Sequence, residues 1–313
     1  EVVLEGADGN DRKKILRAIN DLEAGGSTAG AAGINTAYDI AQKYFIDGGN
    51  NRVILATDGD LNVGLSSESE LTRLIEEKRE SGVFLSVLGF GKGNYKDNRL
   101  EALADYGNGN YSYIDSEKEA KKVLVDEMSG TLFTVAKDVK FQLEFNPANV
   151  KGYRLIGYEN RVMAAEDFND DTKDAGEIGA GHSVTVLYEI VLADSKMELG
   201  ESKLKYASDS EGVMGDELLT VNIRYKEPEG SESKLLTYPV NKSLYSDKMS
   251  ADMNFASCVA EFGMLLRNSR YIGDVTYKDV SAQLSKYDYS DDDYKDEFIY
   301  LVNTMKRRDT NFQ

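Results

Sequence analysis

The segment Arg52-Val53-Ile54-Leu55-Ala56-Thr57-Asp58-Gly59-Asp60 decides the fold predicted for this chain. Its first part is a short, continuous apolar run, which is typical of a strand covered on both faces of a sheet. An Asp-Gly pair follows at once, and open α/β sheets place their ligand sites at the carboxyl ends of such strands. Asp58 is therefore a candidate site residue. The alternative is an Asp-Gly turn that only ends the strand, and these residues alone do not decide between the two.

Strand and helix patterns alternate on both sides of this segment. A second apolar run covers residues 83–90, and a third, weaker one covers residues 110–114. Between these runs apolar residues recur at helical spacing, and Ser116 with Glu119 forms a capping-box pattern that predicts a helix start. Strands separated by helices imply right-handed crossovers and a parallel sheet layered by helices. We therefore predict a doubly wound, Rossmann-like α/β domain over residues 1–136.

The hydrophobic period changes over residues 137–245. Residues 139–145 alternate strictly between apolar and polar, which predicts a strand with Phe141 and its apolar neighbours on a half-buried face. Residues 184–192 and 218–225 behave similarly. Because few helical stretches interrupt these runs, we predict an antiparallel β-sandwich for this region.

Residues 246–313 are predicted to be helical, as a third region. The apolar residues at helical spacing are Phe255, Val259, Phe262 and Leu266, followed by Phe298, Leu301, Val302 and Met305. The chain has one cysteine, Cys258, so no internal disulfide can form. Since Cys258 lies in the first of these helical patterns, we expect its thiol to pack as a small hydrophobic group.

Composition excludes several classes of function. The chain has 37 basic and 55 acidic residues and a net charge of −18, which repels nucleic acid and anionic lipid surfaces and suits cation binding or solubility. No apolar run approaches the roughly 20 residues that cross a bilayer. The chain begins with Glu1 and runs directly into an apolar segment. We therefore expect a piece of a longer protein, with any targeting signal upstream.

A glycine-rich loop, Gly25-Gly26-Ser27-Thr28-Ala29-Gly30, precedes a helical pattern and is the second candidate site segment. One alternative is that Ser27 or Thr28 is only a helix N-cap. A phosphate-binding loop is disfavoured, because the segment lacks the Gly-Lys-Ser/Thr ending of a P-loop.

Taken together, these two segments resemble the von Willebrand factor A domain. In that family a doubly wound sheet carries a metal-ion-dependent adhesion site at its C-terminal edge. Thr28 matches the threonine of that site and Asp58 matches its aspartate. The family's Asp-x-Ser-x-Ser motif, which follows the first strand, has no match here. The resemblance thus implies a domain that lacks its first strand, with the motif upstream of residue 1 and residues 2–4 in the edge strand that follows.

Further segments look like the bacterial YfbK-type lipoproteins, and this match covers essentially the whole chain. They are residues 89–95, 103–111, 166–171 and 259–267. The resemblance implies an exported and often lipid-anchored protein with no established catalytic activity. Membrane association would come only through a lipid anchor that this chain does not contain.

For function, the resemblance implies a non-catalytic adhesion or protein-interaction module outside the cytoplasm. Its metal would be Mg²⁺, or Mn²⁺ or Ca²⁺, and an open position on the metal would accept an acidic side chain of a protein ligand. Octahedral oxygen ligation with retained waters suits such a site. Because Thr28 and Asp58 are only two ligands, we expect a vestigial half-site in this chain and a complete site in the longer parent protein.

Two other classes of function stay open. One is a purely structural envelope module whose β region mediates assembly. The other is a hydrolase that uses Asp58, Asp60 or His182, although no Gly-x-Ser-x-Gly elbow is present.

Residues 167–171 resemble the opening of a calcium loop. They lack its glycine and its final glutamate, so we expect a solvated acidic loop.

Overall fold

The computed structural model describes residues 1–23, 30–58, 68–91, 97–128, 130, 133–158, 161–199, 215–228 and 230–310. Thr28 and Asp60 lie outside the described residues. The chain forms two compact units. The first contains residues 1–142, 165–184 and 223–236, and the second contains residues 143–164, 185–222 and 237–313. The domain limits that we predict from the sequence, after residues 136 and 245, stay a prediction.

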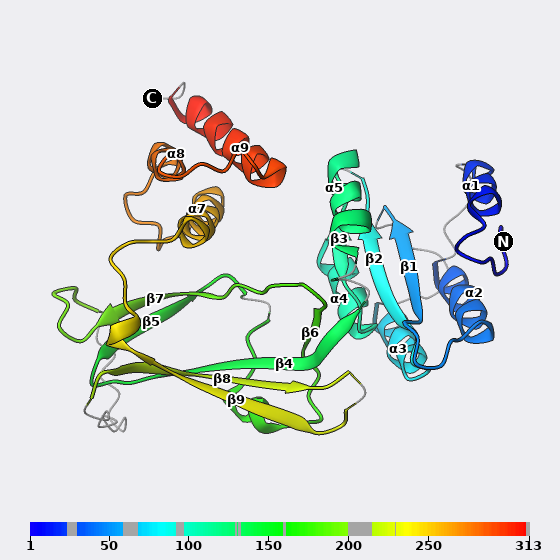
Figure 1. Ribbon diagram of the computed structural model, residues 1–313, viewed down its shortest axis with the longest axis horizontal. Coiled ribbons are helices and arrows are strands. Elements are labelled where there is room, and N and C mark those ends of the chain that lie inside the picture. Colours follow the sequence, from blue (N-terminus) through cyan, green and yellow to red (C-terminus); the bar gives the residue numbers. More distant parts are fainter. Residues whose placement is uncertain are drawn as a thin grey trace. The chain divides into compact units, whose positions relative to one another are not determined.

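A three-stranded parallel sheet forms the centre of the first unit (Figure 1). Its order is β1-β2-β3, and helices alternate with the strands along the chain. The elements are α1 (Arg12–Asn20), α2 (Gly30–Lys43), β1 (Arg52–Thr57), α3 (Glu68–Arg79), β2 (Phe84–Gly89), α4 (Asp97–Tyr106), β3 (Tyr111–Tyr113) and α5 (Glu117–Lys121). This arrangement confirms the predicted α/β fold and all three predicted strands.

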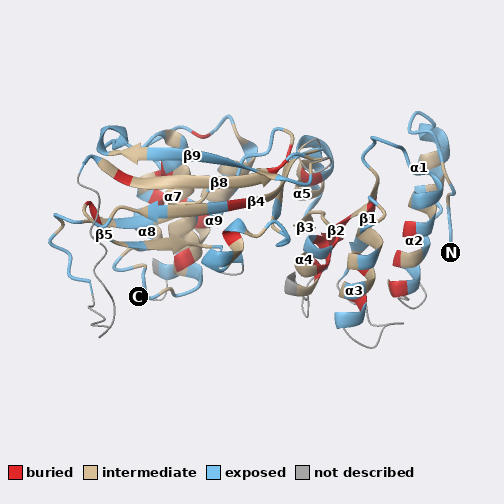
Figure 2. Ribbon diagram, turned by 90° about the horizontal axis from the view of Figure 1, so that it is seen from below, coloured by how far each residue is buried: buried red, intermediate tan, exposed pale blue. Residues whose placement is uncertain are grey.

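One hydrophobic core joins this sheet to its helices, and Figure 2 shows its buried residues along β2 and the facing helices. The strand β2 is buried almost throughout, as its continuous apolar run predicts. The core residues are Ile34, Tyr38, Val53, Leu71, Ile75, Val83, Leu85, Val87, Leu100, Leu103 and Ala104.

The segment before α1 differs from its prediction. Residues 2–4 form no strand, and the side chains of Val2 and Val3 are 46% and 52% exposed. The resemblance had placed an edge strand there, which is wrong for this structure. In the described part of the chain β1 is instead an edge of the sheet, and Ile54 on it is 50% exposed.

The helix predicted from the capping pattern begins where expected. The Ser116 side chain accepts a hydrogen bond from the Glu119 N–H at 3.2 Å, which caps α5. This helix ends at Lys121 and continues as a π-helical turn, η1 (Lys122–Asp126), in which Val123 is buried.

The region that follows contains two sheets. One has the order β6-β4-β8-β9 and the other pairs β5 with β7. The pairs β4–β6 and β5–β7 are antiparallel, as predicted, whereas the face-to-face packing of a sandwich stays a prediction. The elements are β4 (Thr134–Phe145), β5 (Val150–Ile156), η3 (Ala165–Asn169), β6 (Gly176–Gly179), β7 (Leu187–Leu192), β8 (Glu217–Lys226), β9 (Ser233–Asn241) and η4 (Lys242–Leu244).

The predicted half-buried face of β4 is confirmed at Val139, Leu143 and Phe145, which are half-buried, but is wrong at Phe141. Lys140 is only 4% exposed, whereas Phe141 is 39% exposed. The register of β4 against β6 shifts between Ala136 and Val139, and Asp138 has a positive φ of 52°. Such a bulge re-aims the side chains beyond it.

The C-terminal region is helical, as predicted. It consists of α7 (Ala251–Leu266), α8 (Tyr277–Leu284) and α9 (Asp293–Thr310). Their core contains Cys258, which is fully buried, and burial raises the pKa of its thiol to about 11. The cysteine therefore packs as a hydrophobic group, as expected. None of the helices in the described ranges is long and apolar enough to cross a bilayer.

Candidate functional site

Asp58 directly follows the last residue of β1, at the carboxyl end of the parallel sheet. Thr57, Gly89 and Tyr113 lie side by side in the register of the three strands, so the strands end at one edge. The Phe90 N–H donates to the Thr57 carbonyl at 2.8 Å, which extends the pairing one residue past β2. The Asp58 side chain is exposed at this edge. This is the position at which open α/β sheets bind ligands.

The residues around Asp58 form a shallow depression of about 370 Å³. It is lined by Ala56, Thr57, Asp58 and Phe90. Gly91 approaches closely, because a Cβ added to it would lie 3.7 Å from the Cβ of Asp58. Its φ of +107° is a conformation that favours glycine.

Tyr113 also belongs to this edge, and its hydroxyl donates to the Gly91 carbonyl at 2.5 Å. This bond ties the end of β3 to the segment after β2. Sequence reasoning did not single out Phe90, Gly91 or Tyr113 as site residues. The sequence could have indicated these three residues, since each lies near the end of a predicted strand.

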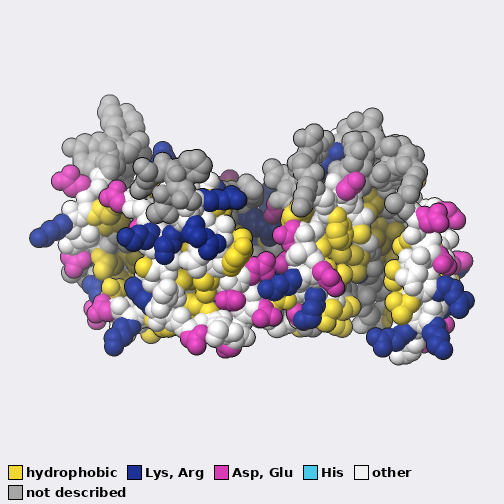
Figure 3. Space-filling model, turned by 90° about the horizontal axis from the view of Figure 1, so that it is seen from above, with side chains coloured by type: hydrophobic (Ala, Val, Ile, Leu, Met, Phe, Trp, Pro, Cys, Tyr) yellow, Lys and Arg dark blue, Asp and Glu magenta, His cyan; other side chains and the backbone are white. Residues whose placement is uncertain are grey.

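Figure 3 views the molecule from the side toward which β1 and β2 point in Figure 1. Hydrophobic side chains lie among the charged ones in the part that carries the parallel sheet. A face of this mixed kind is compatible with protein binding, because interfaces combine an apolar core with a polar rim.

The described residues alone do not fit a magnesium ion. Magnesium prefers six oxygen ligands in octahedral geometry. Asp58 provides one carboxylate at this edge, and Thr28 lies outside the described residues. In the described ranges no three histidine, cysteine or acidic residues come together in a way that could hold a metal. Metal binding by Thr28 and Asp58 therefore stays a proposal.

The loop that resembles a calcium site turns its carbonyl groups to two lysines. The Lys140 ammonium donates to the carbonyls of Asp167 and Asp170, at 3.1 and 2.5 Å. The Lys226 ammonium donates to the Asp171 carbonyl at 2.8 Å. Calcium loops bind their ion through carbonyl and carboxylate oxygens. Lysine ammonium groups thus hold this loop through three of its carbonyls, and the prediction against calcium stays a prediction.

His182, a residue of the hydrolase hypothesis, is exposed in the turn after β6. Its backbone N–H donates to the Gly179 carbonyl at 3.0 Å, which closes that turn.

Two family models match consecutive parts of the chain. Residues 2–127 match the von Willebrand factor type A domain, and residues 130–307 match the C-terminal domain of the uncharacterized protein YfbK. The uncharacterized protein YfbK of Escherichia coli strain K12 is 44% identical over 306 residues. The match covers 96% of this chain and 52% of that protein, so the chain spans about half the length of this relative.

The solved structures that the chain is similar to are more distant. A von Willebrand factor type A protein from Catenulispora acidiphila has a TM-score of 0.41 and 16% identity, covering 95% of this chain and 67% of that one. The human COPII-coat protein Sec24c has a TM-score of 0.35 and 12% identity, covering 81% of this chain and 34% of that one. By the model that matches more than half of its length, the chain belongs to the YfbK C-terminal family, and in it this domain follows a von Willebrand factor type A domain.

Proposed function

We propose that this chain is a non-catalytic protein-interaction module of the cell envelope, which binds an acidic side chain of a protein ligand through a divalent metal. Domains of the von Willebrand A type are generally interaction modules, and the chain contains one. Asp58 and Thr28 would be two of the metal ligands. The remaining ligands would come from an Asp-x-Ser-x-Ser motif upstream, and a lipid anchor upstream would hold the protein at the envelope.

The position of Asp58 supports this proposal most. It is an exposed carboxylate at the carboxyl end of β1, beside a shallow depression, at the edge where three parallel strands end together. Magnesium retains several waters in proteins, so one of its positions can accept a partner's carboxylate.

The test is a manganese titration of a protein extended upstream to include the Asp-x-Ser-x-Ser motif. Free Mn²⁺ is followed by electron paramagnetic resonance. We expect Asp58→Ala to weaken binding at least tenfold, which corresponds to about 1.4 kcal/mol. Asp247→Ala is the matched control, because Asp247 is exposed in a loop elsewhere, and it should leave the affinity unchanged. Equal affinity of wild type and Asp58→Ala would remove Asp58 from the site.

A second function, assembly through the β region, is favoured by the strand β9. It lies at the edge of its sheet, and Leu235 and Tyr238 on it are 53% and 52% exposed (Figure 2). Exposed apolar edge strands pair with other chains. Pull-down from envelope extract with and without EDTA separates the two functions, because binding that survives EDTA favours assembly over the metal site.

A further inference from the structure

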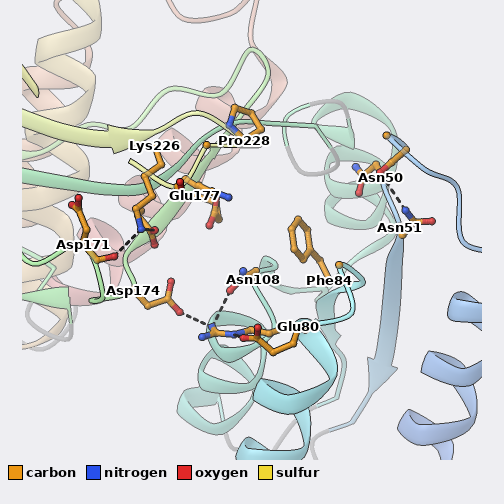
Figure 4. A pocket seen from close by; sticks show the side chains of 18 of the residues that line it. Asn50, Asn51, Glu80, Phe84, Asn108, Asp171, Asp174, Glu177, Lys226 and Pro228 are labelled. Atoms are coloured by element: carbon orange, nitrogen blue, oxygen red, sulfur yellow. Dashed lines mark hydrogen bonds and ion pairs between the residues drawn. The ribbon is translucent and has the colours of Figure 1, made fainter. Parts of the chain in front are cut away.

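A second cavity lies at the opposite ends of the parallel strands. It has a volume of about 620 Å³, and all of its lining residues belong to the first unit. One wall comes from the segments just before the strands, with Asn51 before β1, Gly82 before β2 and Asn108 before β3. The other wall includes Glu177 of β6 and Lys226 of β8 (Figure 4), together with Asp138 of β4. This cavity is therefore separate from the edge that carries Asp58.

Two of the basic residues on the cavity wall already have acidic partners. The Lys226 ammonium lies 2.6 Å from a carboxylate oxygen of Asp138. The Arg79 guanidinium lies 2.6 Å from Asp174 and donates to the Asn108 side-chain carbonyl at 3.0 Å. These pairs line the cavity with groups whose charges are largely neutralised.

Glu177 is the acidic lining residue for which the described part of the structure shows no ion pair, since Asp171 pairs with Arg224 and Glu80 lies 4.0 Å from Arg79. Its Oε2 atom is buried and has no hydrogen-bond partner. Burial, with the nearby carboxylates of Asp138 and Asp174, raises the pKa of Glu177 to about 8, against the smaller opposing effects of Lys137 and Arg52. In the described part of the structure neither of these cations forms an ion pair with Glu177. A buried acceptor without a partner is unfavourable, and a donor placed in the cavity would relieve it.

The remaining lining indicates an organic cation as the ligand. The acidic lining residues outnumber the basic ones: Glu80, Asp138, Asp171, Asp174 and Glu177 against Arg79, Lys137 and Lys226. In the described ranges no three acidic groups lie close enough together to hold a metal ion. A guanidinium group suits such spread acceptors, because it carries five N–H donors in a plane and is more weakly hydrated than an ammonium. The ring of Phe45 also lines the cavity and favours a cation, whereas the Phe84 ring already has the Arg52 guanidinium 5.7 Å from its centre.

We propose that this cavity is a second binding site, which takes the guanidinium group of an arginine side chain presented by a protein partner. The bound guanidinium donates to Glu177, which is then ionised. Because the free carboxyl is protonated at neutral pH, binding releases a proton to the solvent. This site acts independently of any metal at the Asp58 edge.

The test uses N-acetyl-arginine amide as the probe, with N-acetyl-citrulline amide as its uncharged counterpart of similar shape. Calorimetric titration of the 313-residue chain at pH 7, in two buffers of different ionisation enthalpy, gives both the affinity and the protons released. We expect the arginine probe to bind at least tenfold more tightly than the citrulline probe. Release should be about one proton per probe at pH 7 and should nearly vanish at pH 9.

Glu177→Gln keeps the shape of the side chain and removes its charge. We expect this variant to lose at least tenfold in affinity for the arginine probe and to release no proton on binding. Glu198→Gln is the matched control, since Glu198 is exposed and does not line the cavity. The proposal is overturned if the arginine probe does not bind, if both probes bind wild type equally, or if Glu177→Gln binds like wild type. The probe comparison needs no variant, and neither Asp58→Ala nor EDTA should alter these results.

Discussion

Lys140 and Lys226 are buried cations that fix the acidic loop over residues 166–171. Each emerges from a strand, Lys140 from β4 and Lys226 from β8, and each is less than a tenth exposed. Lys226 also pairs with Asp138, whose side chain is 16% exposed. A buried charge is tolerated when its partner and its hydrogen bonds are complete. This loop therefore depends on side chains that lie about 30 and 55 residues away in the sequence.

Replacing Lys226 by alanine should destabilise the protein strongly. The substitution leaves the Asp138 carboxylate without its cation and the Asp171 carbonyl without a donor, which costs about 3–5 kcal/mol for a buried pair. Urea unfolding at pH 7 measures this loss. Lys234→Ala is the matched control, because Lys234 pairs with Glu227 on the surface, where both side chains are at least half exposed. Its cost should stay below about 1 kcal/mol. Equal losses in the two variants would contradict this account of the buried pair.

At the residue scale, Asp58 could be predicted from the sequence, whereas Glu177 could not. The position of Asp58 depends only on the end of one apolar strand, which is a local pattern. The setting of Glu177 depends on Arg52, Asp138 and Asp174, which come from separate segments of the chain. No local pattern records such an environment, so it is visible only once the chain has folded.

At the scale of elements, the turn from α4 to β3 requires glycine because it lies directly against β2. A Cβ added to Gly109 would lie 1.8 Å from the Leu85 carbonyl oxygen, which is a backbone atom and cannot move aside. The Gly109 N–H donates to the Ala104 carbonyl at 2.9 Å and the Gly107 carbonyl accepts from the Leu85 N–H at 2.8 Å. The end of α4 and the strand β2 are therefore in direct backbone contact.

Gly109→Ala should therefore cost about 3 kcal/mol of unfolding free energy, because the added methyl group forces β2 and the turn apart. Gly33→Ala is the matched control. Gly33 lies within α2, is exposed, and has no atom within 4 Å of an added Cβ. That change should be neutral or should stabilise the protein by up to about 1 kcal/mol, since alanine favours the helix. Thermal or urea unfolding compares the two, and a Gly109→Ala variant as stable as wild type would refute the close approach.

The elements that were predicted and those that were missed differ in length and in burial. The strands β1 and β2 are continuous apolar runs, and the helices α7 and α9 are long enough to show a period. The helix α8 was not predicted, because its eight residues leave only Val280 and Leu284 as buried apolar positions. The face of β4 was misassigned at Phe141, since alternation cannot reveal the bulge near Asp138.

At the scale of the whole molecule, β1 and β9 are both edge strands with exposed apolar residues, but they differ in sequence and in the strands beside them. The strand β9 is exposed along most of its length and contains Pro239, a residue that edge strands tolerate. The strand β1 contains no proline, and its described neighbour β2 is buried almost throughout. The family resemblance places the first strand of the von Willebrand A domain beside β1. The relative that matches this chain is also about twice as long.

A chain extended upstream by that strand should therefore be more stable and less prone to aggregate than the 313-residue chain. Covering the half-exposed side chain of Ile54 contributes about 1 kcal/mol by itself, and pairing the backbone of β1 adds to this. Urea unfolding and light scattering compare the two chains. Ile54→Thr tests whether the covering of Ile54 is the cause. It should lower the free energy of unfolding more in the extended chain, where Ile54 is covered, than in the shorter one. Leu235→Thr, on the exposed edge strand β9, should cost the same in both chains. If the shorter chain unfolds as cooperatively and at the same urea concentration as the extended one, the edge of β1 needs no further strand.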